Sequence, residues 1–120
     1  MFLAGCGSTF SDEVIARIDG KDVMKSEYMV YLYTTTESFV SAAGDDVWNM
    51  DFDGMSGEEL VQERAFSTIQ SVAAAENYAA ANGITLTEEE KTAAHEAAEE
   101  FLTRVSEQDL EKMGVDQETL

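Results

Sequence analysis

The chain has 120 residues, of which 44% are hydrophobic, and this length suits one domain with a modest core. Seven Lys and Arg against 25 Asp and Glu give a formal net charge of −18, so nucleic acids and anionic lipid surfaces would be repelled. One cysteine excludes an internal disulfide and a multi-thiolate metal site, and no apolar run approaches the roughly 18 residues that span a membrane.

The N-terminal sequence MFLAGCGSTF contains the only cysteine, Cys6. The run Leu-Ala-Gly-Cys resembles a bacterial lipobox, in which the signal peptide is cut before the cysteine and the cysteine receives the lipid. An export signal needs a basic start and an apolar stretch of about 7 to 15 residues, which this segment is too short to contain. We expect residues 1–12 to be a flexible lead that keeps a remnant of such a signal. The alternative is an incidental cysteine.

The segment from Glu13 to Val23 alternates apolar and polar residues and contains the pair Asp19-Gly20. An Asp-Gly pair between alternating apolar residues predicts a β-hairpin, because both positions of the tight turn need positive φ. An isolated hairpin is only marginally stable in water. We therefore expect the helices that follow to pack on it.

An unbroken apolar block predicts a helix from Lys25 to about Ala43 that is apolar on more than one face. Other helices must cover part of this apolar surface, and the rest of it is available to a partner. Aromatic side chains offer a large contact area, and methionines adapt to varied surfaces. The candidate contacts are Tyr28, Met29, Tyr31, Leu32, Phe39 and Trp48. The alternative places each of them in the core, which is the commoner location for large apolar residues.

The loop from Val47 to Gly57 contains the sequence NMDFDG, which resembles the start of a calcium-binding loop. Such a loop needs a bidentate carboxylate at its twelfth position, and counting from Asn49 that position is Leu60. We therefore interpret the loop as an acidic turn that presents Trp48 and Phe52 to the core, and we expect no metal site.

Two capping boxes, Ser56 with Glu59 and Thr87 with Glu90, predict the starts of two long helices. The first of these would be about 39 Å long at 1.5 Å per residue, and we expect it to be the central helix. The helices expected in this half of the chain cover residues 56–82, 87–105, 107–112 and 117–120. The sequence thus predicts a mainly α fold: a short N-terminal β-hairpin, three long helices and one or two short ones.

No sequence feature indicates catalysis. The only histidine, His95, lies between Ala94 and Glu96 in a predicted helix, where a solvated surface position is expected. The sequence contains no nucleophile elbow, glycine-rich phosphate loop or paired metal ligands. We expect no catalytic residue, no bound metal and no cofactor in this chain.

Three segments in order resemble the N-terminal domain of SurA-like and PrsA-like foldases, a group that includes lipoproteins. They are VIARIDGKDVMKSEYMVYL, GDDVWNMDFDG and SGEELVQERAFSTIQSVAAAENYAAANGITLTEEEK. The resemblance covers residues 13–120, which we expect to be one helical domain, truncated at its C-terminal end. Two features depart from the family: Met24 stands where a capping threonine is frequent, and the parvulin-type prolyl isomerase domain, with its pair of histidines, is missing.

The resemblance implies a chaperone-like domain of an exported foldase, which binds apolar segments of unfolded or partly folded exported proteins and is not itself an enzyme. It also implies a location on the extracytoplasmic side of the cell membrane, with the lipid on Cys6 as the only membrane contact. The alternative is a dimerisation or spacer domain of a larger lipoprotein, whose activity, for example prolyl isomerisation, lies beyond residue 120. A homodimer fits this alternative through an unpaired hairpin edge.

Overall fold

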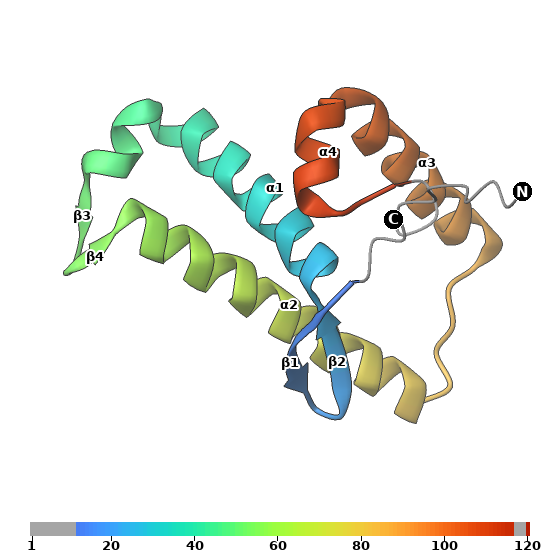
Figure 1. The fold of residues 1–120 in the computed structure, drawn as a ribbon. Coiled ribbons are helices and arrows are strands. Elements are labelled where there is room, and N and C mark those ends of the chain that lie inside the picture. Colours follow the sequence, from blue (N-terminus) through green and yellow to red (C-terminus); the bar gives the residue numbers. More distant parts are fainter. Residues whose placement is uncertain (1–11, 117–119) are drawn as a thin grey trace, which may run out of the picture.

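The computed structural model describes residues 12–116 and residue 120, and Figure 1 shows its fold. The elements are β1 (Val14–Ile18), β2 (Lys21–Met24), α1 (Lys25–Ala43), the 3-10 helix η1 (Asp45–Asn49), β3 (Asp51–Phe52), β4 (Met55–Ser56), α2 (Gly57–Ala81), α3 (Glu88–Arg104) and α4 (Glu107–Met113). The predicted mainly helical fold with an N-terminal hairpin is confirmed. Cys6 and most of the helix expected over 117–120 lie outside the described residues.

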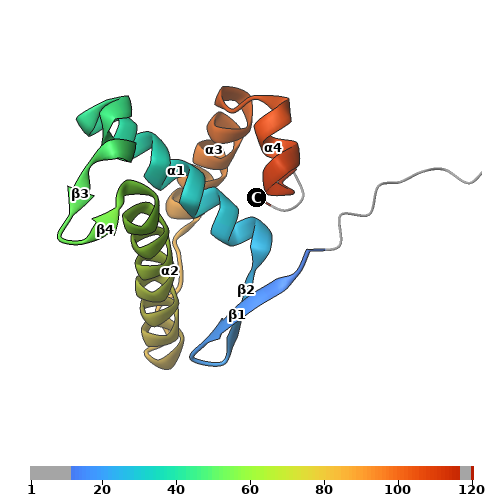
Figure 2. The same cartoon turned by 60° about the vertical axis from the view of Figure 1, so that its left-hand side comes forward.

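Helix α1 lies between α2 on one side and α3 with α4 on the other (Figure 1). It runs antiparallel to α2, and η1 with the small β3–β4 hairpin joins the two helices at one end (Figure 1). Helices α3 and α4 lie on the other side of α1, as Figure 2 shows. The longest helix is α2, as predicted, but α1 is the helix that has neighbours on both sides.

The start of α1 is capped by residues from the other end of the hairpin. Met24, at the N-cap, makes no side-chain hydrogen bond to the helix. The N–H of Lys25 donates to the Glu13 carbonyl at 2.7 Å, and the N–H of Ser26 donates to the Asp12 carboxylate at 3.0 Å. The Ser26 hydroxyl donates to the second Asp12 oxygen. Asp12 therefore takes the role that a capping side chain at the position of Met24 would have.

The first core lies between α2 and the segment that precedes it. The buried residues of α2 recur at every fourth position, which places them on one face: Gly57, Val61, Ala65, Ile69 and Ala73. Val47 of η1 is 1% exposed. A Cβ on Gly57 would lie 2.4 Å from the Val47 carbonyl oxygen, so this close approach of backbone to helix requires glycine.

The second core joins the C-terminal part to α1. Its buried residues Val105, Met113 and Val115 are packed by half-buried side chains from three helices: Met29, Val30, Tyr33, Phe101, Leu102 and Leu110. At the edge of this core Arg104 donates two hydrogen bonds to Glu37, at 2.7 and 2.8 Å, and its guanidinium lies 5.6 Å from the Phe101 ring centre. These contacts attach the end of α3 to α1.

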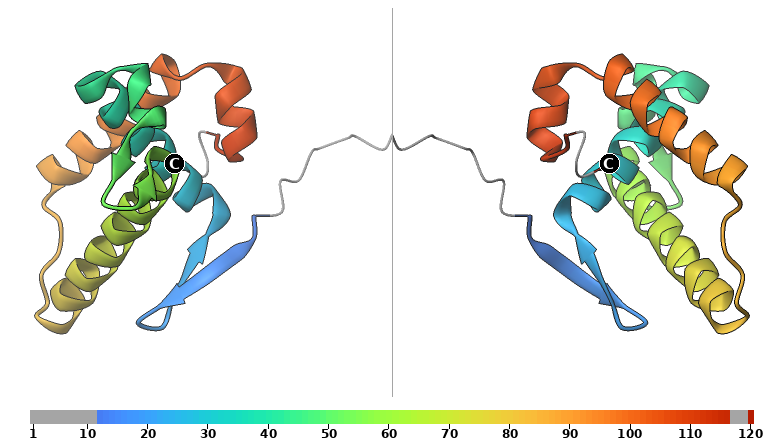
Figure 3. Two further views of the ribbon diagram at one scale, coloured as in Figure 1. Left: turned by 90° about the vertical axis from the view of Figure 1, so that its left-hand side faces the viewer. Right: turned by 90° about the vertical axis from the view of Figure 1, so that its right-hand side faces the viewer.

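The hairpin extends away from the helical body beside α2 (Figure 3). Lys21 of β2 forms an ion pair with Glu76 of α2, and Val23 is buried. The hairpin thus contacts α2 through this ion pair, while Val14 and Ile15 of β1 stay exposed. In the described part of the chain, no helix is long and apolar enough to cross a membrane.

Candidate ligand-binding grooves along α1

Helix α1 buries very little for a helix with neighbours on two sides. Every residue from Glu27 to Glu37 is half-buried, and Ser26 is the only fully buried residue of the helix. A helix that only supports a core would show one buried stripe, as α2 does. The apolar block of α1 therefore keeps part of its surface open to solvent on several faces.

The six candidate contact residues have different surroundings. Met29 packs against the second core, so its side chain is a core contact. Tyr28, Tyr31, Leu32 and Phe39 are half-buried, and none of the six lies in the fully buried core.

The expectation that the acidic loop presents Trp48 to the core is wrong. Trp48 is 39% exposed, and its neighbour Val47 occupies the core position, 1% exposed. Phe52, the other aromatic residue of the loop, is half-buried. The backbone of η1 packs against the start of α2, with the Val47 carbonyl facing Gly57, and in this arrangement Val47 and not Trp48 is the buried residue of η1.

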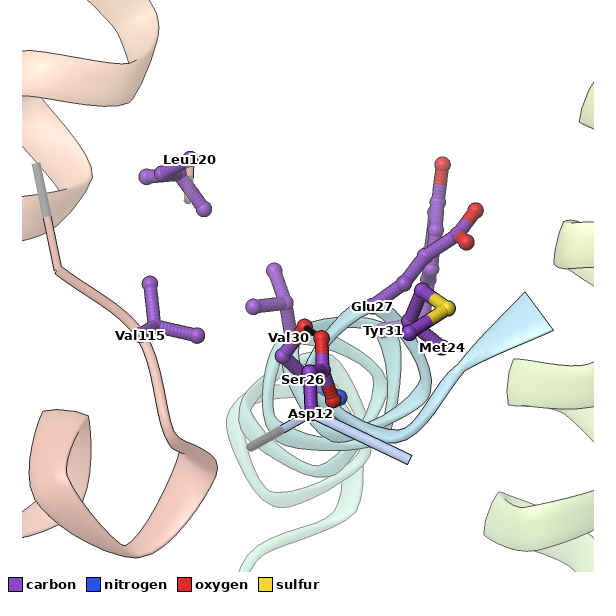
Figure 4. Close-up of a pocket in the computed structure, with 8 residues that line it drawn as sticks. All are labelled: Asp12, Met24, Ser26, Glu27, Val30, Tyr31, Val115 and Leu120. Carbon is purple, nitrogen blue, oxygen red and sulfur yellow. Dashed lines mark hydrogen bonds between the residues drawn. The ribbon is translucent and has the colours of Figure 1, made fainter. Parts of the chain in front are cut away.

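One cavity of about 430 Å³ lies at the start of α1, and we call it the N-terminal pocket. Its lining residues are Asp12, Met24, Ser26, Glu27, Val30, Tyr31, Val115 and Leu120. Figure 4 shows Val115 and Leu120 on one side of Val30, with Glu27, Tyr31 and Met24 on the other. Residues from the start of α1 and from the C-terminal part of the chain thus line the pocket together, and most of this lining is apolar.

A second, shallower cavity of about 510 Å³ lies between α1 and α2, and we call it the α1–α2 groove. Its lining residues are Tyr31, Thr34, Thr35, Ser38, Phe39, Arg64 and Thr68. Tyr31 also lines the N-terminal pocket, so the two cavities meet at this side chain. The eight-residue separation of Tyr31 and Phe39 corresponds to about 12 Å along the helix axis.

The hydroxyl groups of the groove are held by their own helices. Thr35 donates to the Tyr31 carbonyl at 2.7 Å, and Ser38 donates to the Thr34 carbonyl at 3.0 Å. On the opposite wall Thr68 donates to the Arg64 carbonyl at 2.9 Å. The hydroxyl oxygens still have acceptor capacity, and the threonine methyl groups add apolar surface. These hydroxyl residues therefore add neutral surface of mixed polarity to both walls.

The electrostatics of the groove are dominated by Arg64. Desolvation, with a smaller contribution from the nearby carboxylate of Glu27, raises the pKa of Tyr31, so its phenol stays protonated and neutral near pH 7. Among the described residues that line the groove, Arg64 alone carries a charge near pH 7.

The sequence missed Arg64 and the hydroxyl groups as parts of a candidate site. The available signal was helical spacing, because Tyr31, Thr35 and Phe39 recur at every fourth position and so share one face. Arg64 on α2 gave no sequence signal, since its proximity to α1 depends on how the two helices pack. Among residues 12–116 and 120, no group of three His, Cys, Asp or Glu side chains is placed to hold a metal ion.

No family model, curated protein or solved structure matches this chain. The resemblance to SurA-like and PrsA-like foldases consequently stays a prediction from the quoted segments, and the cavities along α1 are described from their geometry alone.

Proposed function

We propose that this chain is a chaperone-like domain of an exported foldase that binds apolar segments of unfolded exported proteins along α1. The observation that carries the proposal is the half-buried apolar block of α1, with a cavity on each side of Tyr31. The same proposal includes lipid attachment at Cys6 and a location on the extracytoplasmic side of the cell membrane, and both rest on the sequence.

The surface properties of α1 suit transient binding. Half-buried aromatic side chains such as Tyr31 and Phe39 present contact area without needing to be ordered from a mobile state, so the entropy cost of binding is low. The net charge of −18 keeps the molecules apart from one another, which limits self-association of the exposed apolar surface. Binding of this kind needs no catalytic group.

The test is suppression of aggregation of reduced insulin by the 120-residue chain, followed by light scattering at 0.15 M salt. We expect the parent to delay aggregation, and Tyr31→Ala and Phe39→Ala to delay it several-fold less, because each removes a wall of the α1–α2 groove. Tyr78→Ala is the matched control, since Tyr78 is 66% exposed on α2 and does not line either cavity. Circular dichroism spectra must show that the variants fold like the parent.

A second candidate function, a dimerisation or spacer domain, is favoured by the hairpin. In the described residues β1 pairs only with β2, and Val14 and Ile15 are 55% and 44% exposed. An open strand with exposed apolar side chains can pair with a strand from another chain. No delay of insulin aggregation by a well-folded parent, together with a dimer in analytical ultracentrifugation that Ile15→Lys dissociates, would favour this function.

A further inference from the structure

Arg64 differs from every other cationic side chain of this protein. Six of the seven Lys and Arg residues have a carboxylate oxygen within 4.0 Å, in the pairs Arg17–Asp22, Lys21–Glu76, Lys25–Glu13, Lys91–Glu88, Lys112–Asp109 and Arg104–Glu37. In the part of the chain that the structure describes, Arg64 has no such partner. With 25 acidic residues in the sequence, an unpaired guanidinium is the exception that needs a reason.

The surroundings of Arg64 explain how it stays unpaired. Its helical neighbours at i−4 and i+4 are Leu60 and Thr68, so no carboxylate is within reach on its own face of α2. On the opposite wall the residues that line the groove are Tyr31, Phe39 and three hydroxyl residues of α1. The guanidinium therefore keeps its five N–H donors available at a cavity that already has apolar walls.

We infer that the α1–α2 groove takes an internal Asp or Glu side chain of an extended client segment, with the carboxylate on Arg64 and apolar side chains on Tyr31 and Phe39. This rests on the proposed function and specifies its substrate class. A side chain within the segment fits better than a chain terminus, because the groove is shallow and open to solvent. Charge complementarity selects the partner, since a guanidinium forms its strongest hydrogen bonds with a carboxylate.

The dimensions of the groove predict a spacing in the client. Tyr31 and Phe39 are about 12 Å apart along α1 at 1.5 Å per residue, which an extended segment spans in about four residues at 3.3 Å each. Residues two apart in an extended segment point to the same side. The favoured pattern is therefore apolar, any residue, acidic, any residue, apolar.

The test compares two labelled peptides by fluorescence anisotropy at 0.15 M salt, where the Debye length of about 8 Å screens the distant carboxylates of the protein. Both are acetylated and amidated and contain Phe-Ser-Glu-Ser-Leu or Phe-Ser-Gln-Ser-Leu, so the internal carboxylate is their only difference. We expect the parent to bind the Glu peptide about three- to tenfold more tightly, as for a partly exposed charge-assisted contact. In Arg64→Gln the two peptides should bind equally, with the Gln peptide unchanged.

Lys91→Gln is the matched control, because it removes the same charge from α3 and should keep the preference. Arg64→Lys keeps the positive charge but lacks the planar guanidinium, and it should keep part of the preference for the Glu peptide. Equal binding of both peptides by the parent, or a preference that survives in Arg64→Gln, overturns the inference and leaves the proposed function standing. Binding of neither peptide, with insulin aggregation unaffected, overturns both.

Discussion

Helices α2 and α3 begin in the same way but are held in the fold differently. Each starts with a complete capping box, Ser56 with Glu59 and Thr87 with Glu90, and each is rich in alanine. Yet α2 has five buried residues and α3 has none. Local signals therefore determine where these helices start, whereas burial depends on what lies opposite.

The difference comes from the neighbours of each helix. The small buried residues of α2 let α1 and η1 approach closely, as at Gly57. The alanines of α3 face solvent along most of its length, and the helix is attached near its C-terminal end through Phe101 and Arg104. We expect the α1–α2 half to set the global stability and the α3–α4 half to open first.

The largest expected effect comes from the first core. Ile69→Ala should lower the free energy of unfolding by about 2 to 5 kcal/mol, because it leaves a cavity at a side chain that is 2% exposed. Urea denaturation followed by circular dichroism measures this loss. Leu102→Ala in α3 is the comparison, and it should cost less because Leu102 is only half-buried. An equal loss from both variants would contradict the division into a stable and a labile half.

An intermediate effect is expected from Asp12, which fixes the hairpin to α1. Asp12→Ala removes the cap of α1 and should lower the free energy of unfolding by about 1 kcal/mol near pH 7. Since Asp12 is exposed, solvent screening keeps the value at or below this figure. Glu63→Ala removes one negative charge from an exposed position of α2 and should have a smaller effect.

The effect of Asp12→Ala should depend on pH. Desolvation of the Asp12 carboxylate acts to raise its pKa, but the hydrogen bonds from Ser26 and Glu13, with the charge of Lys25, outweigh it and lower the pKa. A pKa that is lower in the folded state stabilises the fold above the unfolded value of about 3.9, and this contribution is lost as the pH falls through the folded value. The difference between parent and Asp12→Ala should therefore shrink below about pH 4. A difference that grows in acid would rule out the carboxylate as the cap.

The smallest effect is expected from Arg104→Met, which keeps the length of the side chain but removes both hydrogen bonds to Glu37. Amide hydrogen exchange should become faster in α3 and α4 and stay unchanged in α1 and α2, because the contact joins the two halves only at their edge. Arg17→Met, which breaks an exposed ion pair within the hairpin, is the control and should leave α3 unchanged. Faster exchange throughout the chain after Arg104→Met would show that the halves do not open separately.

The sequence predicted those parts of the fold that depend on neighbouring residues. The bounds of α1, both capping boxes and the hairpin turn at Asp19-Gly20 could be read directly, because each depends on residues a few positions apart. The same reasoning missed the β3–β4 hairpin, although Asp53-Gly54 has positive φ at both residues, as Asp19-Gly20 does. Its strands are only two residues long, so no alternating pattern accompanied the turn.

The parts that escaped prediction depend on residues far apart in the sequence. Asp12 caps a helix that starts thirteen positions later, and the position of Arg64 across the groove from the hydroxyl residues of α1 depends on how the two helices pack. Likewise, the interpretation of the acidic loop placed Trp48 in the core, whereas Val47 is the buried residue there and Trp48 is exposed. Spacing along the chain shows which residues share a face of a helix, but not which of its faces packs against another element.

The position of α1 between α2 and the C-terminal helices (Figure 1) has a consequence for the order of folding. The contacts of α1 with α2 join residues that are close in the sequence, whereas its contacts with Met113 and Val115 close a loop of more than half the chain. Short loops cost less entropy to close, so they form sooner. We expect the α1–α2 pair to assemble first. Helix α4 should then dock last on α1, which the rest of the molecule has already positioned.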